Sequence, residues 1–245
     1  MKAMLFAAGK GTRLKPLTDQ HPKCLVTADD TTLLEHNIQL LKMNGVTSIV
    51  INTHYLSSQI TDFVNQHDFG VEIKLSPEAE LLETGGGLLH AANQFRNEEA
   101  FLVCNSDIYT DLDLRALTIS HLEHNNLATM AVADRKTARY LRFNDQNLLC
   151  GWENQKTGEE IAWNNDPFHP LAFNGIQVLS PRIFGFMEAF GTAFSTIPVY
   201  LKAAEAGELI QAYRMDDAFW IDIGTIEKLE ELRIHLAQVQ SLRKV

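Results

Sequence analysis

The sequence predicts an α/β fold in which one mixed, mostly parallel sheet is flanked by helices. Short apolar segments alternate with amphipathic segments through the first half of the chain, and polar or glycine-rich loops follow the apolar segments. This alternation is typical of repeated β-α-β units, whose right-handed crossovers leave helices on both faces of a parallel sheet. A chain of 245 residues suits one domain of this kind. We therefore expect residues 1–245 to form a single Rossmann-like domain.

The regular alternation lies in the first half of the chain. Strands are expected at 2–8, 48–53, 71–75 and 100–104, and helices at 32–43, 57–66 and 84–95. The first helix has a defined start, because Thr32 and Glu35 have the spacing of a capping box. From about residue 128, shorter strands are expected at 128–133, 140–143 and 171–179, a polar insert at 154–169, and helices near 181–189, 197–206 and 226–239. We interpret this second half as completing the sheet and forming a pocket wall.

The charge and the cysteine content of the chain limit which binding partners and which cellular compartment are expected for the protein. The net charge of −10 disfavours a nucleic-acid partner, yet the first 23 residues carry five basic side chains against one acidic. The three cysteines, Cys24, Cys104 and Cys150, are widely spaced, which argues against a disulfide framework or a zinc site. The apolar opening 1–8 is too short for a signal peptide or a membrane span. We expect a cytoplasmic protein with no nucleic-acid or membrane partner.

The most informative segment runs from Ala7 to Lys23 and begins Ala-Ala-Gly-Lys-Gly-Thr-Arg-Leu-Lys-Pro-Leu-Thr. Glycines let backbone N–H groups approach phosphate oxygens, Arg13 offers a planar fork and Lys23 a point charge. A dinucleotide fingerprint would require a third glycine where Leu14 stands, and a Walker loop would require Gly-Lys-Ser/Thr after a longer spacer. The segment therefore predicts a triphosphate site of another kind.

On this segment the chain resembles the sugar-phosphate nucleotidyltransferase family, whose signature is Gly-x-Gly-Thr-Arg-Leu-x-Pro-Leu-Thr ending in Pro-Lys. The resemblance implies the nucleotide-diphospho-sugar transferase fold, with a nucleotide-binding half (1–125) and a sugar-binding, sheet-completing half (126–245). It also implies an enzyme that uses Mg²⁺ to join a nucleoside monophosphate from a triphosphate to a sugar 1-phosphate, with release of pyrophosphate. These two substrates are then the expected partners of a monomer or small homo-oligomer.

The segment from Glu80 to Gly87 places three glycines at an expected helix entry. Glycine weakens helix initiation, so the triplet suggests close approach by a ligand, with a flexible turn as the alternative. The resemblance implies that this segment cradles the base and ribose. A carboxylate at Glu80 could accept from guanine N1–H or from uracil N3–H, so the base stays open.

Two apolar strands each end in an aspartate, Asp107 after 101–106 and Asp222 after 219–221. Mg²⁺ prefers oxygen ligands, and one or two carboxylates suffice when substrate phosphates complete its shell. The resemblance agrees with both assignments, since these motifs match the positions of the two magnesium-binding aspartates of the family. An Asp that caps a following helix is the alternative for either residue alone.

The acceptor end of the site follows from the resemblance. Asn174 and Gly175 match its sugar-binding position. Glu153 falls where many relatives carry Glu-Lys-Pro, whose lysine holds the sugar phosphate, but here Gln155 stands near the lysine position and Lys156 is one step away. A basic cluster could also meet the acceptor or form a solvated face; it comprises Arg135, Lys136 and Arg139.

The expected site thus has three groups of residues, each implied by the resemblance. The catalytic residues are Arg13, Lys23, Asp107 and Asp222, with Arg13 on the departing pyrophosphate, Lys23 near the α-phosphate, and both aspartates on the metal. The nucleotide-binding residues are Ala8, Gly9, Gly11, Thr12, Arg13, Lys23, Glu80, Thr84, Gly85 and Asn105. The sugar-phosphate-binding residues are Glu153, Asn174 and Gly175.

Several substrate pairs and two other classes of protein remain open. Segments 50–54 and 76–87 are most similar to the N-acetylmuramate 1-phosphate uridylyltransferases, while mannose 1-phosphate guanylyltransferases and glucose 1-phosphate uridylyl- or thymidylyltransferases are alternatives. A nucleotide-sugar-binding regulatory subunit without turnover is disfavoured by the intact Arg13, Lys23, Asp107 and Asp222. A nicotinamide-dependent oxidoreductase is disfavoured by Leu14.

Overall fold

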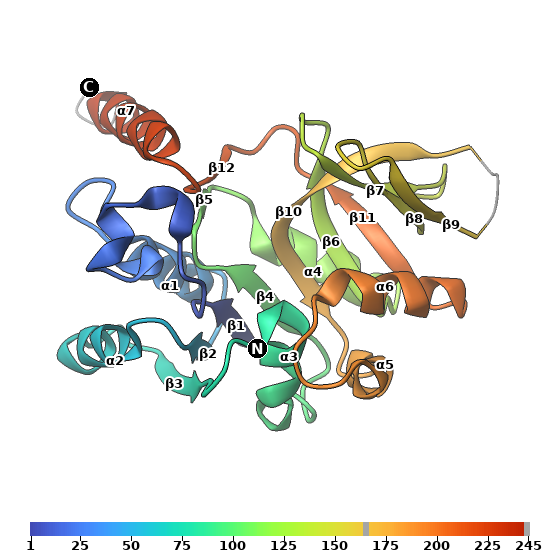
Figure 1. Cartoon of the computed structure of the whole chain (residues 1–245), viewed down its shortest axis with the longest axis horizontal. Helices are drawn as coiled ribbons and strands as arrows, with labels where there is room; N and C mark the ends of the chain where they lie inside the picture. Colours follow the sequence, from blue (N-terminus) through green and yellow to red (C-terminus); the bar gives the residue numbers. More distant parts are fainter. Residues whose placement is uncertain (164–166, 243–245) are drawn as a thin grey trace.

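A ten-stranded mixed sheet forms the centre of the computed structural model, which describes residues 1–163 and 167–242 (Figure 1). Four parallel strands form one end of this sheet, in the order β3 (Glu72–Pro77), β2 (Ser48–Thr53), β1 (Lys2–Phe6) and β4 (Phe101–Asn105). This order confirms the predicted α/β fold with parallel strands in the first half of the chain. The carboxyl ends of β1, β2 and β4 therefore lie at one edge.

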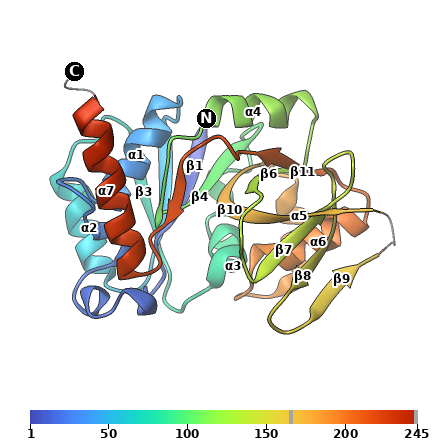
Figure 2. The same cartoon turned by 90° about the horizontal axis from the view of Figure 1, so that it is seen from above.

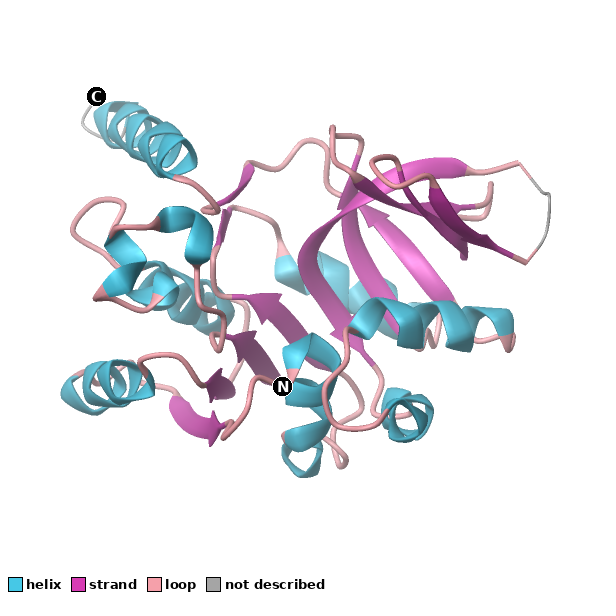
Figure 3. Ribbon diagram, in the orientation of Figure 1, coloured by secondary structure: helices cyan, strands magenta, loops and turns pink. Residues whose placement is uncertain are grey.

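The second half of the chain extends the sheet with mostly antiparallel strands (Figure 3). Strand β10 (His169–Leu179) is antiparallel to β4 and also pairs with β6 (Ala128–Ala133) and β7 (Arg139–Phe143). The remaining strands are β8 (Leu149–Asn154) and β9 (Glu159–Ala162), which continue from β7, and β11 (Ile210–Arg214), which pairs with β6. The insert expected at 154–169 thus contains β9, and its residues 164–166 lie outside the described part.

Helices cover both faces of the sheet (Figure 2). One face packs against α1 (Leu33–Met43), α2 (Ser57–Gln66) and α4 (Leu114–Glu123), and the other against α3 (Glu83–His90), α5 (Ile183–Met187) and α6 (Thr196–Glu205). Helix α1 begins as its capping box predicts, because the Thr32 hydroxyl accepts from the Glu35 N–H at 3.1 Å. Among the described helices, none has the length and apolar composition needed to span a membrane.

The last described helix, α7 (Ile226–Leu242), packs outside these two layers against the glycine-rich loop near the N-terminus (Figure 1). A separate apolar cluster joins them; it contains Leu14, Val26, Ala28, Leu33, Ile221, Ile223, Leu229, Leu232 and Leu236. The Arg233 guanidinium adds hydrogen bonds to the carbonyls of Ala28 at 3.1 Å and Thr27 at 3.2 Å. The last helix therefore supports a loop that lies some 200 residues earlier in the chain.

Truncation of Leu232 to alanine should lower the free energy of unfolding by about 2–5 kcal/mol, because this side chain is fully buried between α7 and the loop. Urea denaturation followed by circular dichroism measures the change. Ile234→Ala is the matched control, since Ile234 is 61% exposed on the same helix and its truncation should change stability by less than about 0.5 kcal/mol. Equal effects of the two substitutions would contradict the packing role of α7.

Candidate active site

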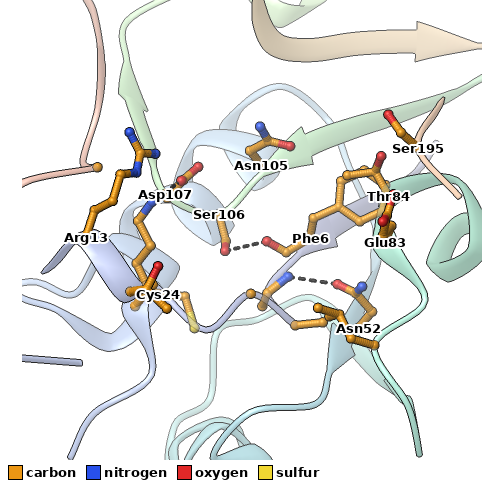
Figure 4. A pocket seen from close by; sticks show the side chains of 18 of the residues that line it. Phe6, Arg13, Cys24, Asn52, Glu83, Thr84, Asn105, Ser106, Asp107 and Ser195 are labelled. Atoms are coloured by element: carbon orange, nitrogen blue, oxygen red, sulfur yellow. Dashed lines mark hydrogen bonds and ion pairs between the residues drawn. The ribbon is translucent and has the colours of Figure 1, made fainter. Parts of the chain in front are cut away.

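A cavity of about 530 Å³ opens at the carboxyl ends of β1, β2 and β4 (Figure 4). Its position is the one expected for a ligand site in a parallel sheet. The residues that line it are Phe6, Ala7, Ala8, Gly9, Gly11, Thr12, Arg13, Lys23, Cys24, Asn52, Leu81, Glu83, Thr84, Asn105, Ser106, Asp107, Arg139, Ser195 and Gly224. Figure 4 shows Arg13 and Asp107 toward one end, and Glu83, Thr84 and Ser195 toward the other.

The two glycines of the loop after β1 serve different purposes. Gly9 has no atom within 4 Å of the place where a Cβ would stand, so its backbone is open to the cavity. Gly11 has a φ of +61°, and a Cβ there would lie 2.9 Å from the Thr18 methyl group. The Thr18 hydroxyl in turn donates to the Gly11 carbonyl at 2.8 Å. Gly9 thus leaves room for a ligand, while Gly11 allows the tight turn.

A buried carboxylate ties this loop to the segment before α3. The Ala7 N–H donates to Asn52 Oδ1 at 2.8 Å, and Asn52 Nδ2 donates to Glu78 Oε1 at 2.7 Å. The other Glu78 oxygen accepts from the Leu82 N–H at 3.0 Å, and Glu78 is only 6% exposed. These neutral donors satisfy both carboxylate oxygens, as burial requires. No local sequence pattern predicts this network, which reaches the cavity through Asn52.

Close packing within the chain itself accounts for the three glycines of α3, and the approach of a ligand to them stays a prediction. The Phe194 carbonyl accepts from the N–H groups of Gly85 at 2.7 Å and Gly86 at 3.1 Å. A Cβ on Gly86 would lie 2.1 Å from the Thr192 carbonyl oxygen, and one on Gly87 would lie 2.5 Å from a Glu78 oxygen. The first turn of α3 therefore packs directly on the segment around Phe194, which satisfies two of its free amides.

The two predicted metal-binding aspartates lie at the same end of a separate two-stranded ribbon, where Asp222 ends one strand and Asp107 directly precedes the other. Strands β5 (Ile108–Thr110) and β12 (Trp220–Asp222) are antiparallel, with Asp222 opposite Ile108. The Ile223 N–H also donates to the Asp107 carbonyl at 2.8 Å. Asp107 lines the cavity and forms an ion pair with Lys23. Among the described residues, the cavity wall includes Gly224 but not Asp222.

The Arg13 side chain packs on the backbone of Gly224, two residues after Asp222. A Cβ on Gly224 would lie 3.0–3.1 Å from the guanidinium atoms of Arg13, so the glycine lets this side chain lie flat on the backbone. Both residues line the cavity. The ribbon of β5 and β12 therefore brings Asp107 close to Gly224, on whose backbone the Arg13 side chain lies.

Two of the potential nucleophiles in the cavity wall are unsuited to attack, because the Cys24 thiol is protonated and the Ser106 hydroxyl is held in a hydrogen bond. Burial raises the pKa of the Cys24 thiol to about 12, so it is protonated at neutral pH and a poor nucleophile. The Ser106 hydroxyl donates to the Phe6 carbonyl at 2.6 Å. This arrangement favours direct transfer between bound substrates over a covalent intermediate on either residue.

Asn174 and Gly175 lie behind the cavity wall. Asn174 is 1% exposed, and its Oδ1 accepts from Arg135 Nε at 2.7 Å, while its Nδ2 has no partner within the described ranges. Burial lowers the pKa of the Arg135 guanidinium, and the charge of Asp222 opposes that shift. Gly175 has a φ of +74°, and a Cβ there would lie 2.5 Å from the amide nitrogen of Asn105. Gly175 thus shapes the cavity through Asn105, which lines it.

Glu153 does not face the cavity. Arg142 Nε donates to its carboxylate at 2.9 Å, and Arg142 also pairs with Glu160 at 2.5 Å. In the β7–β8 ladder, Glu153 stands opposite Tyr140, one position from the pair of Arg139 and Asn154. Side chains alternate along a strand, so Glu153 lies on the other face from the cavity-lining Arg139. The sequence identifies Glu153 by its motif, but only the register of the β7–β8 ladder shows on which face of the sheet its side chain lies.

The structure brings most of the predicted nucleotide-binding residues to the cavity wall. These are Ala8, Gly9, Gly11, Thr12, Arg13, Lys23, Thr84 and Asn105. Glu80 is exposed outside the wall, and Gly85 lies behind it against Phe194. Glu83 lines the cavity instead, with an unusual φ of +60° for a residue other than glycine. Tertiary contacts bring in further wall residues that no sequence motif predicted, namely Phe6, Asn52, Ser195 and Gly224.

Basic side chains and a carboxylate meet here over a glycine-containing loop at the edge of a parallel sheet, an arrangement suited to nucleoside phosphates. The class defined by this fold and site is that of nucleotide-dependent transferases. A family model described as nucleotidyl transferase matches residues 2–143. The chain belongs to this family, and its relatives are sugar 1-phosphate nucleotidyltransferases.

Two relatives illustrate the range of substrates. The N-acetylmuramate alpha-1-phosphate uridylyltransferase of Neisseria meningitidis serogroup B is 33% identical over 238 residues, covering 94% of this chain and 96% of that protein. The mannose-1-phosphate guanyltransferase of Neurospora crassa is 34% identical over 243 residues, covering 91% of this chain. The chain spans only 61% of the length of that second relative.

Solved structures agree on the fold. HddC from Yersinia pseudotuberculosis, complexed with GMP-PN, superposes with a TM-score of 0.77 at 21% identity, covering 96% of this chain and 99% of that one. A UDP-glucose pyrophosphorylase complexed with UDP-glucose gives a TM-score of 0.77 at 17% identity, covering 97% and 98%. The expected nucleotide-diphospho-sugar transferase fold is thereby confirmed.

Gly86→Ala should lower the free energy of unfolding by about 1–3 kcal/mol, because the new methyl group meets the Thr192 carbonyl. Gly185→Ala is the matched control on α5, where nothing lies within 4 Å of the new Cβ. That change should be neutral or stabilising by up to about 1 kcal/mol. Thermal unfolding measures both. A Gly86→Ala protein of unchanged stability that bound triphosphate poorly would support ligand approach instead of chain packing.

Proposed function

We propose that this protein transfers a nucleoside monophosphate from a nucleoside triphosphate to a sugar 1-phosphate and releases pyrophosphate. The observation that carries this proposal is the cavity wall shared by Gly9, Arg13, Lys23 and Asp107. Open backbone at Gly9 and two cationic side chains suit a triphosphate, and a carboxylate beside them suits its metal ion. In this assignment residues 1–125 hold the nucleotide and residues 126–245 hold the sugar.

The proposed reaction requires the alignment of two polyanions, the triphosphate and the sugar 1-phosphate, and does not depend on acid–base catalysis. An ionised sugar phosphate already carries its nucleophilic oxygen, so the α-phosphorus can be attacked without a general base. Arg13 would hold the departing pyrophosphate by its planar fork, and Lys23 would neutralise charge near the α-phosphate. For that, Lys23 exchanges its ion pair with Asp107 for one with the phosphate.

The donor set fits Mg²⁺. Asp107, directly before β5, and Asp222, at the end of β12, would supply hard oxygen ligands, and Mg²⁺ commonly takes one or two carboxylates with substrate phosphates and water. Within residues 1–163 and 167–242, His, Cys, Asp and Glu form no cluster of three, so the two aspartates would hold the ion together with substrate. The ion would supply Lewis-acid stabilisation of phosphoryl charge.

For the substrates, we favour UTP and N-acetylmuramate 1-phosphate, hence a cytoplasmic role in cell-wall metabolism. The support is the Neisseria uridylyltransferase, which matches this chain over nearly the whole length of both proteins. A guanylyltransferase for mannose 1-phosphate is the second candidate, supported by a similar identity over 91% of the chain. Glu83, which lines the cavity, could accept an N–H from either base.

A regulatory subunit without turnover is the rival from another class. Such a protein needs nucleotide-sugar binding but no metal-binding carboxylates, whereas Asp107 and Asp222 here lie at the same end of the β5–β12 ribbon. Turnover of any pair of triphosphate and sugar 1-phosphate decides between the two proposals. The same assay, run with UTP and GTP against a panel of sugar 1-phosphates, identifies the substrates.

Asp107→Asn and Asp222→Asn should each lower kcat by about 100-fold or more in the presence of Mg²⁺, because each removes a charged metal ligand. Release of pyrophosphate measures turnover. Asp217→Asn is the matched control, since Asp217 is exposed on the same segment as Asp222 and lies outside the cavity wall. Circular dichroism and the melting temperature confirm folding of all three variants. Normal turnover of Asp107→Asn and Asp222→Asn would exclude the proposed metal site.

A further inference from the structure

One cationic side chain of the cavity wall has no role in the site described so far. Arg13, Lys23 and Arg139 are the basic residues that line the cavity. Arg13 and Lys23 come from the loop after β1, whereas Arg139 is the first residue of β7 in the other half of the chain. Its side chain is exposed and forms no ion pair or hydrogen bond within the described ranges.

The neighbouring basic residues are not available for a ligand in the same way. The Arg135 guanidinium donates to Asn174 and to the Phe173 carbonyl and lies 4.2 Å from the Trp220 ring. Arg142 is held between two carboxylates on β8 and β9. Lys136 is exposed and lies outside the cavity wall. Of these four basic residues, Arg139 is thus the one that lines the cavity with an unpaired side chain.

The register of β7 and β8 gives this residue a defined place. Arg139 is directly opposite Asn154, and Leu141 is opposite Trp152. Side chains that stand opposite one another share a face and have Cβ atoms about 4.5–5.5 Å apart. Leu141 is buried in the main apolar cluster and Trp152 packs against it. The face that Arg139 shares with Asn154 is therefore the inward face, and Glu153 points to the outer one.

This pairing accounts for the departure from the Glu-Lys-Pro motif. Gln155 stands near the position of the lysine that holds the sugar phosphate in relatives, and Asn154 beside it is also uncharged. Arg139 is the cross-strand partner of Asn154. A positive charge missing from β8 is thus present on the adjacent strand, on the same face and at the cavity wall.

We propose that Arg139 binds the phosphate of the acceptor sugar 1-phosphate, replacing the absent lysine across the β7–β8 ladder. This inference rests on the proposed function. The guanidinium fork can hold two phosphate oxygens that do not attack, which leaves the third free. Its charge also offsets the repulsion between the acceptor phosphate and the triphosphate. Arg139 thereby determines affinity for the acceptor while leaving the nucleotide end of the cavity unchanged.

Steady-state kinetics of the Arg139→Gln variant separates an effect on binding of the sugar 1-phosphate from an effect on binding of the triphosphate. We expect KM for the sugar 1-phosphate to rise about 10- to 100-fold, the effect of losing a charge-assisted hydrogen bond, with KM for the triphosphate within twofold of the original. Arg139→Lys should recover part of the loss, because it keeps the charge without the fork. Lys136→Gln is the matched control and should leave both KM values unchanged, since Lys136 is a basic residue of the same connection outside the wall.

The outcomes distinguish this inference from the function on which it rests. If the unaltered protein turns over no pair of triphosphate and sugar 1-phosphate, the proposed function fails. If it turns over a pair and Arg139→Gln keeps the original KM for the acceptor, the assignment of Arg139 alone is overturned. Equal increases in both KM values would also overturn it, because they indicate a structural effect. The melting temperature of each variant verifies that the fold is retained.

Discussion

The pairing of β5 with β12 is the constraint on which the site depends. One short antiparallel ladder, extended by the hydrogen bond from the Ile223 N–H to the Asp107 carbonyl, joins the end of the parallel sheet to the end of the chain. The Thr110 hydroxyl reinforces it by donating to the Phe219 carbonyl at 2.7 Å. Without this ladder, Gly224 would not lie beneath Arg13, and α7 would have no fixed point from which to pack on the loop.

Much of the fold follows from local patterns in the sequence. The helix after Thr32 and the strand 48–53 coincide with α1 and β2, because a capping box and an uninterrupted apolar run are strong local signals. Local patterns predicted no element at 108–123 or 210–214, where β5, α4 and β11 form. Strands β5 and β11 are short, so they depend on their partners β12 and β6 more than on their own composition.

The site was predictable where residues are adjacent in the chain and not where tertiary contacts decide. The loop from Ala8 to Arg13 reaches the cavity as its glycines and arginine suggest. The glycines of α3 carry the same local signal, yet their neighbour is the Phe194 carbonyl, which no local pattern reveals. Likewise, the motif identifies Glu153 but not the face of β8 on which it lies, and a shift of one residue in register exchanges the faces.

The contact between α3 and Phe194 also makes the two halves of the chain inseparable. Two amides at the start of α3 receive their acceptor from a residue more than a hundred positions later. A fragment that stopped near residue 125 would expose those amides and the apolar surface that α6 covers. The first half is therefore not a portable unit, and grafting it onto another protein would require a substitute for residues 192–196.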